Sequence, residues 1–425
     1  MRPDCGTMSK PSGWSPLSGR AQARLMSLTG ALLQKPPRSP ISGADRNVTT
    51  KLRGEMRYLR HLVACYGAVA FLLAILSGCA GPREAGPPPP SASAPPVSQR
   101  PEAPPQPPAQ PTVTPVPTPT PRSPFTGRPL AAPDMPRRPI AVKVDNAPAA
   151  RPQWGLSQAE LVIEAPAEGF ATRFTALFSE RDLERVGPVR SARPFDLGLS
   201  RIYDFMLAYT GAGNTLTWRI AEQHVPSLKA PELAEPIPPD SPYYRTTDRR
   251  PPHNLYVNLA RFRQKMAEVG TRDTTTLQAF TFYAAPPEEG PVHTIELGYH
   301  PLYRAVYRYD PASRSYRRFT GGQPHIDALT RQQIAVDNVI VQYIEMWPAP
   351  EYEPDSAGNV VLDGKLLGEG RAQLFHDGHA IEGRWVQPGE GEPPRFLDAT
   401  GKAVELKPGS VWLHLVPLTF QVTFR

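Results

Sequence analysis

Two arginines stand where the sequence predicts the start of a helix, in the run Val189-Arg190-Ser191-Ala192-Arg193-Pro194. The N-terminus of a helix carries about half a positive charge, so a nearby cation typically costs ~0.3–1 kcal/mol. An anionic ligand would explain the pair, because helix N-termini and arginine side chains both bind phosphate or carboxylate groups. Ion pairing within the protein would also explain it. Candidate acids are Glu164, Asp182 and Asp196, and further arginines open to either role are Arg151, Arg173 and Arg185.

Polar side chains also stand at the ends of predicted strands. Asp145 and Asn146 follow one strand, Glu164 ends another, and Glu168 lies near a loop. Strand ends in mixed α/β sheets are common ligand positions, and with His253 these residues would have acid–base capacity. Turn formation by Asp145 and Asn146, with capping by His253, is the structural alternative. The ligand-binding residues predicted for this cleft are Arg190, Arg193, Arg173, Arg151, Asp145 and Asn146, and the candidate catalytic residues are Glu164, Glu168 and His253.

Motifs that would identify an enzyme or a metal site are missing from residues 79–425. No GxSxG elbow, SxxK motif, phosphate-binding loop or HExxH helix occurs there. His376 and His379 flank a two-residue turn, but they do not have a recognised ligand spacing. We therefore expect no metal and no cofactor, and the sequence favours a non-catalytic protein without deciding the question.

The elements that must position these residues are strands and helices in residues 125–290. Strands are predicted at Ile140–Val144, at Leu161–Glu164 and at Phe205–Tyr209, and a further strand has Phe170, Phe174 and Phe178 on one side. One helix is predicted after Pro194, which suits a first helical position, because Phe195, Leu199, Ile202 and Met206 recur at helical spacing. A second helix is predicted from Asn258, a favourable N-cap, to Gly270, a favourable stop.

Residues 291–425 are predicted to be mainly β. The predicted strands are Tyr303–Tyr309, Ser315–Phe319, Val336–Tyr343, Gln373–Phe375, Ala380–Trp385 and Val411–Val416. The pair Asp377-Gly378 between two of them is a strong hairpin signal, and the regular turn spacing suggests a small barrel, roll or sandwich. The predicted fold is α+β, with a mixed α/β N-terminal domain at 125–290 and a mainly antiparallel β C-terminal domain at 291–425.

The segment that begins at Met56 has the three parts of a secretory signal. A basic start with Arg57 and Arg60 precedes an apolar run, Leu62–Leu76, and small residues lead to Cys79. The run is 15 residues long, which is shorter than the ~20 residues of a spanning helix. The ending resembles the lipobox of bacterial lipoproteins, which predicts a lipid, typically palmitate-containing, on Cys79. An uncleaved anchor helix is the alternative. Residues 56–78 are thus a predicted lipoprotein signal peptide, and residues 1–55 a disordered, non-native extension.

Charge and proline content describe the rest of the chain. Of its 47 basic and 40 acidic residues, residues 1–78 hold 11 and 3, so the part after them is close to neutral. This balance argues against a nucleic-acid partner. Residues 82–124 contain 18 prolines in 43 positions, so residues 79–124 are predicted to be a lipidated cysteine followed by an extended linker. Cys79 would be the one cysteine of the mature protein, which excludes an internal disulfide or a catalytic thiol.

Several motifs resemble a family of bacterial envelope proteins, the YerB-type lipoproteins, whose two domains have no known function. They are RPIAV at 138–142, ARPQ at 150–153, GLSQA at 155–159, VGPVRSAR at 186–193, PHNLY at 252–256, AVDNVI at 335–340 and WLHLVP at 412–417. The resemblance covers nearly all of 125–420 and implies a two-domain, exported, lipid-anchored protein. Phe170 departs from the family, which tends to have a small residue there.

These observations favour a non-catalytic lipoprotein on the extracytoplasmic face of a bacterial membrane. It would be attached through the lipid on Cys79 and would bind an anionic ligand, a glycan or a partner protein through the arginine-rich cleft. One alternative is a hydrolase of the cell wall or another envelope polymer that uses the carboxylate and histidine residues. A second alternative is an envelope scaffold that recruits a partner through an exposed sheet edge or apolar patch.

Overall fold

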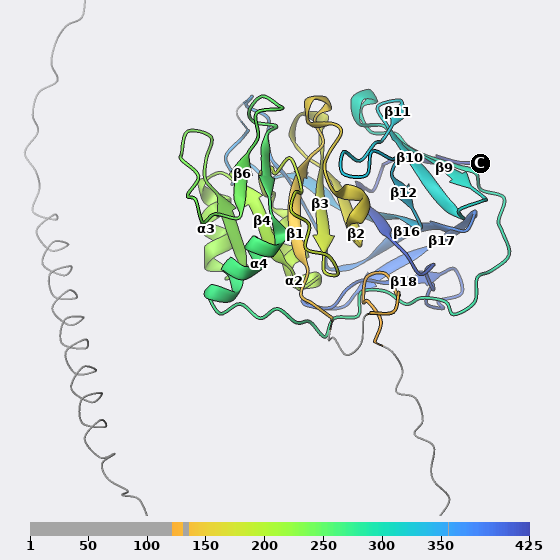
Figure 1. The fold of residues 1–425 in the computed structure, drawn as a ribbon. Coiled ribbons are helices and arrows are strands. Elements are labelled where there is room, and N and C mark those ends of the chain that lie inside the picture. Colours follow the sequence, from red (N-terminus) through yellow and green to blue (C-terminus); the bar gives the residue numbers. More distant parts are fainter. Residues whose placement is uncertain (1–120, 131–135, 356) are drawn as a thin grey trace, which may run out of the picture. The chain divides into compact units, whose positions relative to one another are not determined.

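The computed structural model describes residues 121–130, 136–355 and 357–425 (Figure 1). The predicted extension 1–55, signal peptide 56–78 and lipidation site Cys79 lie outside these residues, as does the linker up to residue 120. Among the described residues, no helix is both long enough and apolar enough to cross a membrane.

We call residues 125–290 the first half and residues 291–425 the second half. Strands from both halves form one ten-stranded sheet, in the order β18-β17-β16-β13-β19-β2-β3-β1-β4-β5 (Figure 1). The first half supplies β1 (Ile140–Asp145), β2 (Leu161–Pro166), β3 (Thr172–Phe178), β4 (Met206–Thr210) and β5 (Ser227–Ala230). The second half supplies β13 (Asn338–Ile344), β16 (Gly368–His376), β17 (His379–Gln387), β18 (Arg395–Asp398) and β19 (Val411–Pro417). The halves join where β19 runs parallel to β2, with Leu413 opposite Ile163. The strands at this junction are buried along most of their length, as expected for a sheet covered on both faces.

Two hydrophobic cores cover the two faces of this sheet. Helices α2 (Phe195–Ile202) and α3 (Asn214–Glu222) contribute to one core, and α4 (Leu259–Glu268) contributes to the other. A six-stranded sheet packs on the same face as α4, through residues such as Tyr307. Its strands are β8 (Thr294–Leu297), β9 (Ala305–Asp310), β10 (Ser315–Thr320), β11 (Gln323–Pro324), β12 (Ala335–Val336) and β20 (Val422–Phe424). Two small hairpins complete the described fold: β6 (Tyr243–Arg245) with β7 (Leu255–Val257), and β14 (Met346–Pro348) with β15 (Leu362–Gly364).

The α+β fold predicted from sequence is confirmed, and the local signals that predicted it are visible. Helix α2 follows Pro194, and the side chain of Asn258 caps α4 by accepting a hydrogen bond from the backbone N–H of Arg261 at 3.0 Å. Met206 lies in β4 and not on the preceding helix, which ends at Ile202. The placement of Phe170 in a strand is wrong: it ends a short 3-10 helix before β3, and its side chain is 81% exposed.

The turn Asp377-Gly378 joins β16 to β17 and packs directly against Gly290. The N–H of Gly290 donates to the carbonyl of Asp377 at 2.9 Å, and a Cβ on Gly290 would lie 2.5 Å from the carbonyl oxygen of Gly378. We expect Gly290→Ala to lower the free energy of unfolding by about 1–3 kcal/mol, because the backbones would have to separate. Gly389→Ala is the control, since nothing lies within 4 Å of its Cβ position. Equal melting temperatures for the two variants would contradict this expectation.

Candidate functional site

The predicted site residues of the first half gather around the end of β1. Asp145 is the last residue of β1 and lies opposite Arg173 on β3. The run that contains Arg190 lies along β1, because Val189 bridges to Val144 and the N–H of Arg190 donates to the carbonyl of Lys143 at 2.9 Å. Sheet order and this flanking run therefore bring the arginines to one place.

Three arginines surround two buried carboxylates here, and we call this set the arginine cluster: Arg173, Arg190, Arg193, Asp145, Glu168 and His253. Asp145 lies 3.2 Å from Nε of Arg190, 3.6 Å from Nη1 of Arg173 and 2.8 Å from Nδ1 of His253. Arg193 contacts Glu168 through Nε at 2.5 Å and donates a hydrogen bond through Nη2 at 2.7 Å. The two arginines at the helix start thus pair with internal acids, although with different ones from those that their sequence positions suggested.

The three acids suggested for that pairing have other partners. Asp182 pairs with Arg137 and Arg263. Asp196 pairs with the buried Lys143 at 3.0 Å, and it also accepts a hydrogen bond from the backbone N–H of Arg193 at 2.7 Å. This contact places a carboxylate at the start of α2 and compensates the positive end of the helix.

The charges of the arginine cluster are not balanced. Burial disfavours the charged form of Asp145, but the hydrogen bond from His253 and the charges of Arg173 and Arg190 outweigh it, so the pKa of Asp145 lies well below its usual range. Burial and the nearby arginines lower the pKa of Arg190, although Asp145 opposes this shift. Nε of Arg190 and Nε of Arg193 lie close to a carboxylate oxygen, whereas Nε of Arg173 is buried and has no hydrogen-bond partner among the described residues. Three guanidinium groups facing two carboxylates leave an excess of positive charge.

Glu164, a candidate catalytic residue, belongs to a different set of contacts. It is fully buried, and it accepts hydrogen bonds from Nη2 of Arg318 at 2.7 Å, Oγ1 of Thr172 at 2.8 Å and Nε1 of Trp412 at 3.2 Å. Burial raises the pKa of Glu164, but the charge of Arg318 and the other contacts reverse this effect and lower it. Glu164 is therefore an ionised partner of Arg318 with no exposed surface.

Arg318 is the centre of a buried polar network that sequence reasoning missed. Its guanidinium group contacts the hydroxyl of Tyr307 at 3.2 Å and also contacts His325. His414 bonds to the same tyrosine hydroxyl at 2.8 Å, and the side chain of Gln153 bonds to His325 at 2.8 Å. Residues of both halves thus meet inside the protein. Alternation along β10, where Tyr316, Arg318 and Thr320 are buried, is the sequence signal that could have found this arginine.

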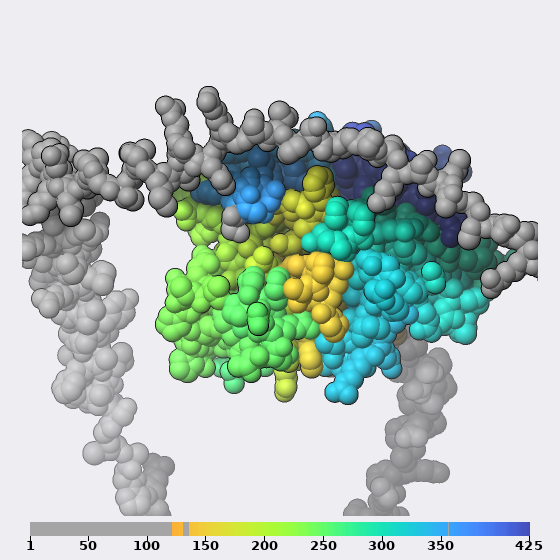
Figure 2. Space-filling view, turned by 90° about the horizontal axis from the view of Figure 1, so that it is seen from above, coloured from red at the N-terminus to blue at the C-terminus, as the bar shows by residue number. Residues whose placement is uncertain are grey.

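Arg151 and Asn146 connect the arginine cluster to the second half. Arg151 donates through Nε to Oδ1 of Asn146 at 3.1 Å and through Nη2 to its carbonyl at 2.8 Å. The guanidinium group also lies 5.5 Å from the ring centre of Tyr303. Figure 2 looks down on the molecule and shows the golden segment after β1 between green loops of the first half and teal and cyan loops of the second.

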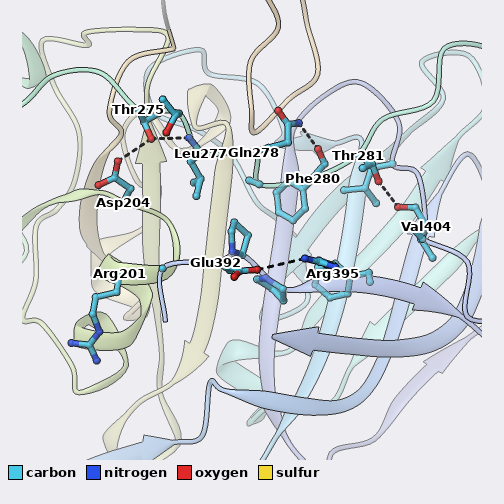
Figure 3. Close-up of a pocket in the computed structure, with 18 residues that line it drawn as sticks. Arg201, Asp204, Thr275, Leu277, Gln278, Phe280, Thr281, Glu392, Arg395 and Val404 are labelled. Atoms are coloured by element: carbon cyan, nitrogen blue, oxygen red, sulfur yellow. Dashed lines mark hydrogen bonds and ion pairs between the residues drawn. The ribbon is translucent and has the colours of Figure 1, made fainter. Parts of the chain in front are cut away.

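A cavity of the described structure lies elsewhere and is lined by none of the predicted site residues. It has a volume of about 640 Å³ and an apolar floor that includes Phe280, Phe396 and Leu406. Leu277 and Phe280 point into the opening, toward Glu392 and toward Arg395 at the start of β18 (Figure 3). The described residues contain no group of three or more histidine, cysteine, aspartate or glutamate side chains arranged to hold a metal ion.

Comparison with known proteins identifies relatives that span both halves of the described chain. Residues 125–272 match the family model "Protein of unknown function (DUF3048) N-terminal domain", and residues 295–413 match the corresponding C-terminal domain. "Putative lipoprotein YerB" of Bacillus subtilis (strain 168) is 32% identical over 301 residues, which are 70% of this chain and 86% of that protein.

A solved structure agrees with this match. The crystal structure of the YerB protein from Bacillus subtilis superimposes with a TM-score of 0.61 at 28% identity, and the match covers 71% of this chain and 99% of the crystallised one. The resemblance seen in the sequence motifs is thereby confirmed. This chain belongs to the DUF3048 family, together with YerB.

Proposed function

We propose that this chain is a lipid-anchored protein of the bacterial envelope that binds an anionic ligand at the arginine cluster. The lipobox-like ending at Cys79 and the lipoprotein name of its relative support the anchor. The anchor would place the protein on the extracytoplasmic face of a membrane, with the proline-rich linker as a spacer.

The observation that carries the binding proposal is the unbalanced charge of the arginine cluster. Within the described residues, the ion pairs of Arg173, Arg190 and Arg193 are with Asp145 and Glu168, and the side chain of Arg190 remains 26% exposed. A phosphate or carboxylate at the exposed side of Arg190 would accept charge-assisted hydrogen bonds and would offset the excess of positive charge. Arginine suits such ligands because its planar group donates two parallel hydrogen bonds.

The lowered pKa values of two carboxyl groups support a binding function over hydrolysis of an envelope polymer. A general acid needs a raised pKa in order to hold its proton near neutral pH. The pKa values of Asp145 and Glu164 are lowered, and arginine or histidine partners occupy both groups. Glu164 also has no surface that a substrate could reach. These two acids are therefore suited to holding arginine and histidine side chains in place.

The proposal predicts that Arg190→Ala combined with Arg193→Ala weakens binding of inorganic pyrophosphate by tenfold or more. The loss of charge-assisted hydrogen bonds, at about 1.5–3 kcal/mol each, accounts for this factor. Calorimetric titration measures the affinity, and circular dichroism reports the fold. Arg384→Ala is the matched control, because Arg384 is an exposed arginine on β17 that pairs with Glu369. Unchanged pyrophosphate affinity in a folded double variant would refute the proposal. If the double variant unfolds, the single variant Arg190→Gln replaces it, because this arginine is the most exposed of the three.

A further inference from the structure

We propose that the anionic ligand is a saccharide whose ring packs on aromatic side chains beside the arginine cluster. This inference rests on the proposed anion binding and adds three residues to it: Phe170, His300 and Tyr303, which we call the aromatic row. They come from the loop before β3 and from the start and end of a short turn before β9, so both halves of the chain contribute to it.

Phe170 has an unusual position for a large apolar residue. Its side chain is 81% exposed, and its backbone has φ of 63°, in the left-handed region that non-glycine residues rarely adopt. A strained conformation persists only where the surrounding structure imposes it, and such residues cluster at binding sites. Here the strained backbone holds an aromatic ring in solvent, where a bound ligand could pack against it.

The rings of Phe170, His300 and Tyr303 lie next to one another, with His300 in contact with both of the others. The ring centres of Phe170 and His300 are 6.2 Å apart at an interplanar angle of 24°, and those of His300 and Tyr303 are also 6.2 Å apart. His300 is exposed and Tyr303 is partly exposed. The aromatic row therefore offers ring surface to a ligand over more than one side chain.

Both ends of the aromatic row connect to the arginine cluster. Glu168, two residues before Phe170, receives the hydrogen bond from Arg193 at 2.7 Å. At the other end, Arg151 lies against Tyr303 and bonds to Asn146, the neighbour of Asp145 in sequence. An acidic group bound by the arginines would thus have its attached ring near the aromatic row.

A saccharide fits this combination better than a lipid surface does. The apolar C–H face of a pyranose packs on aromatic rings, while its acidic substituent needs cationic donors, and the described site supplies both. Insertion into a membrane would need a contiguous apolar patch, whereas the short turn that carries His300 and Tyr303 adds one large exposed apolar side chain, Leu302. Free phosphate would use the arginines and leave the rings unused.

The test compares probes that share the anion but differ in the ring. Calorimetry with the protein measures affinity for N-acetylglucosamine 1-phosphate and for inorganic phosphate. We expect the sugar phosphate to bind about tenfold more tightly, because ring stacking adds to the anion contacts. Phe170→Ala should remove this advantage without changing the affinity for phosphate, and Phe170→Trp should keep it. Trp218→Ala is the control, because Trp218 is another exposed aromatic residue, 59% exposed on α3.

The outcomes separate the two proposals. If phosphate binding depends on Arg190 but the sugar ring adds nothing, or if Phe170→Ala leaves the advantage intact, the saccharide inference is wrong and the anion site stands. If neither probe binds, both proposals fail. Binding to phosphatidylglycerol vesicles that is lost in Phe170→Ala, without any preference for the sugar phosphate, would assign the aromatic row to a membrane surface instead.

Discussion

Replacing Arg318 with methionine is expected to lower the free energy of unfolding by about 3–5 kcal/mol. The side chains of Arg318 and Glu164 are both completely buried and lie 2.7 Å apart. Methionine would fill much of the volume but leave the carboxylate of Glu164 without its counter-charge in the protein interior. Because the pair joins β10 of the second half to β2 of the first, its loss should weaken both halves together. Urea unfolding followed by fluorescence measures the change.

Two further variants separate the effect of charge from that of packing. Glu164→Gln combined with Arg318→Met removes both charges, so it should recover part of the loss, and the double-mutant cycle gives the coupling energy. Arg384→Met breaks the exposed pair with Glu369 and should cost less than about 1 kcal/mol. If Arg318→Met costs no more than Arg384→Met, the buried pair does not stabilise the fold as described.

The second large effect is a loss of stability between pH 6.5 and 4 that depends on His414. Burial lowers the pKa of His414 to about 4, although Glu164 opposes the shift, so the folded protein holds this histidine neutral. In the unfolded chain, a histidine takes up a proton below about pH 6.5. Acidification therefore favours the unfolded state until the folded form also protonates near pH 4, for a total of roughly 3 kcal/mol.

The measurement must isolate His414 from other groups that titrate in this range. Burial raises the pKa of Glu160 to about 7, which works in the opposite direction, because acidification through that range favours the folded state. The comparison is therefore between the pH dependences of the original protein and of His414→Gln, measured by urea unfolding from pH 7 to 4. The variant should lose less stability on acidification, whereas His293→Gln, at an exposed position, should follow the original protein. Parallel curves for all three proteins would contradict the assignment.

Local sequence patterns predicted most strands of the ten-stranded sheet and two of its helices. The alternation at Ile140–Val144, the proline before α2 and the N-cap Asn258 act over a few residues, and each element forms where its own signal lies. The same patterns located Asp145, Glu164 and Glu168 near strand ends. The prediction that Phe170 lies on a strand failed, because the even spacing of Phe170, Phe174 and Phe178 carries no information about a backbone turn with positive φ.

The partners of the charged residues could not be predicted in this way. The side chains of Arg190 and Arg193 pair with Asp145 and Glu168 and not with the acids that the sequence suggested. The reason is that the strand order β2-β3-β1, and the segment 189–193 beside β1, determine which side chains converge. Arg318 was missed although β10 was predicted, because its partner lies 154 positions away in the sequence.

The sequence by itself predicted most strands of the ten-stranded sheet, helices α2 and α4, the family and the residue types available for binding, since these depend on short-range periodicity and on motif spacing. The tertiary structure alone decided that β19 inserts beside β2, so that the two halves share one sheet and a buried polar network. It also decided that three arginines face two carboxylates beside exposed aromatic rings. Such contacts depend on pairing between distant strands, whose register sets the final position of every side chain.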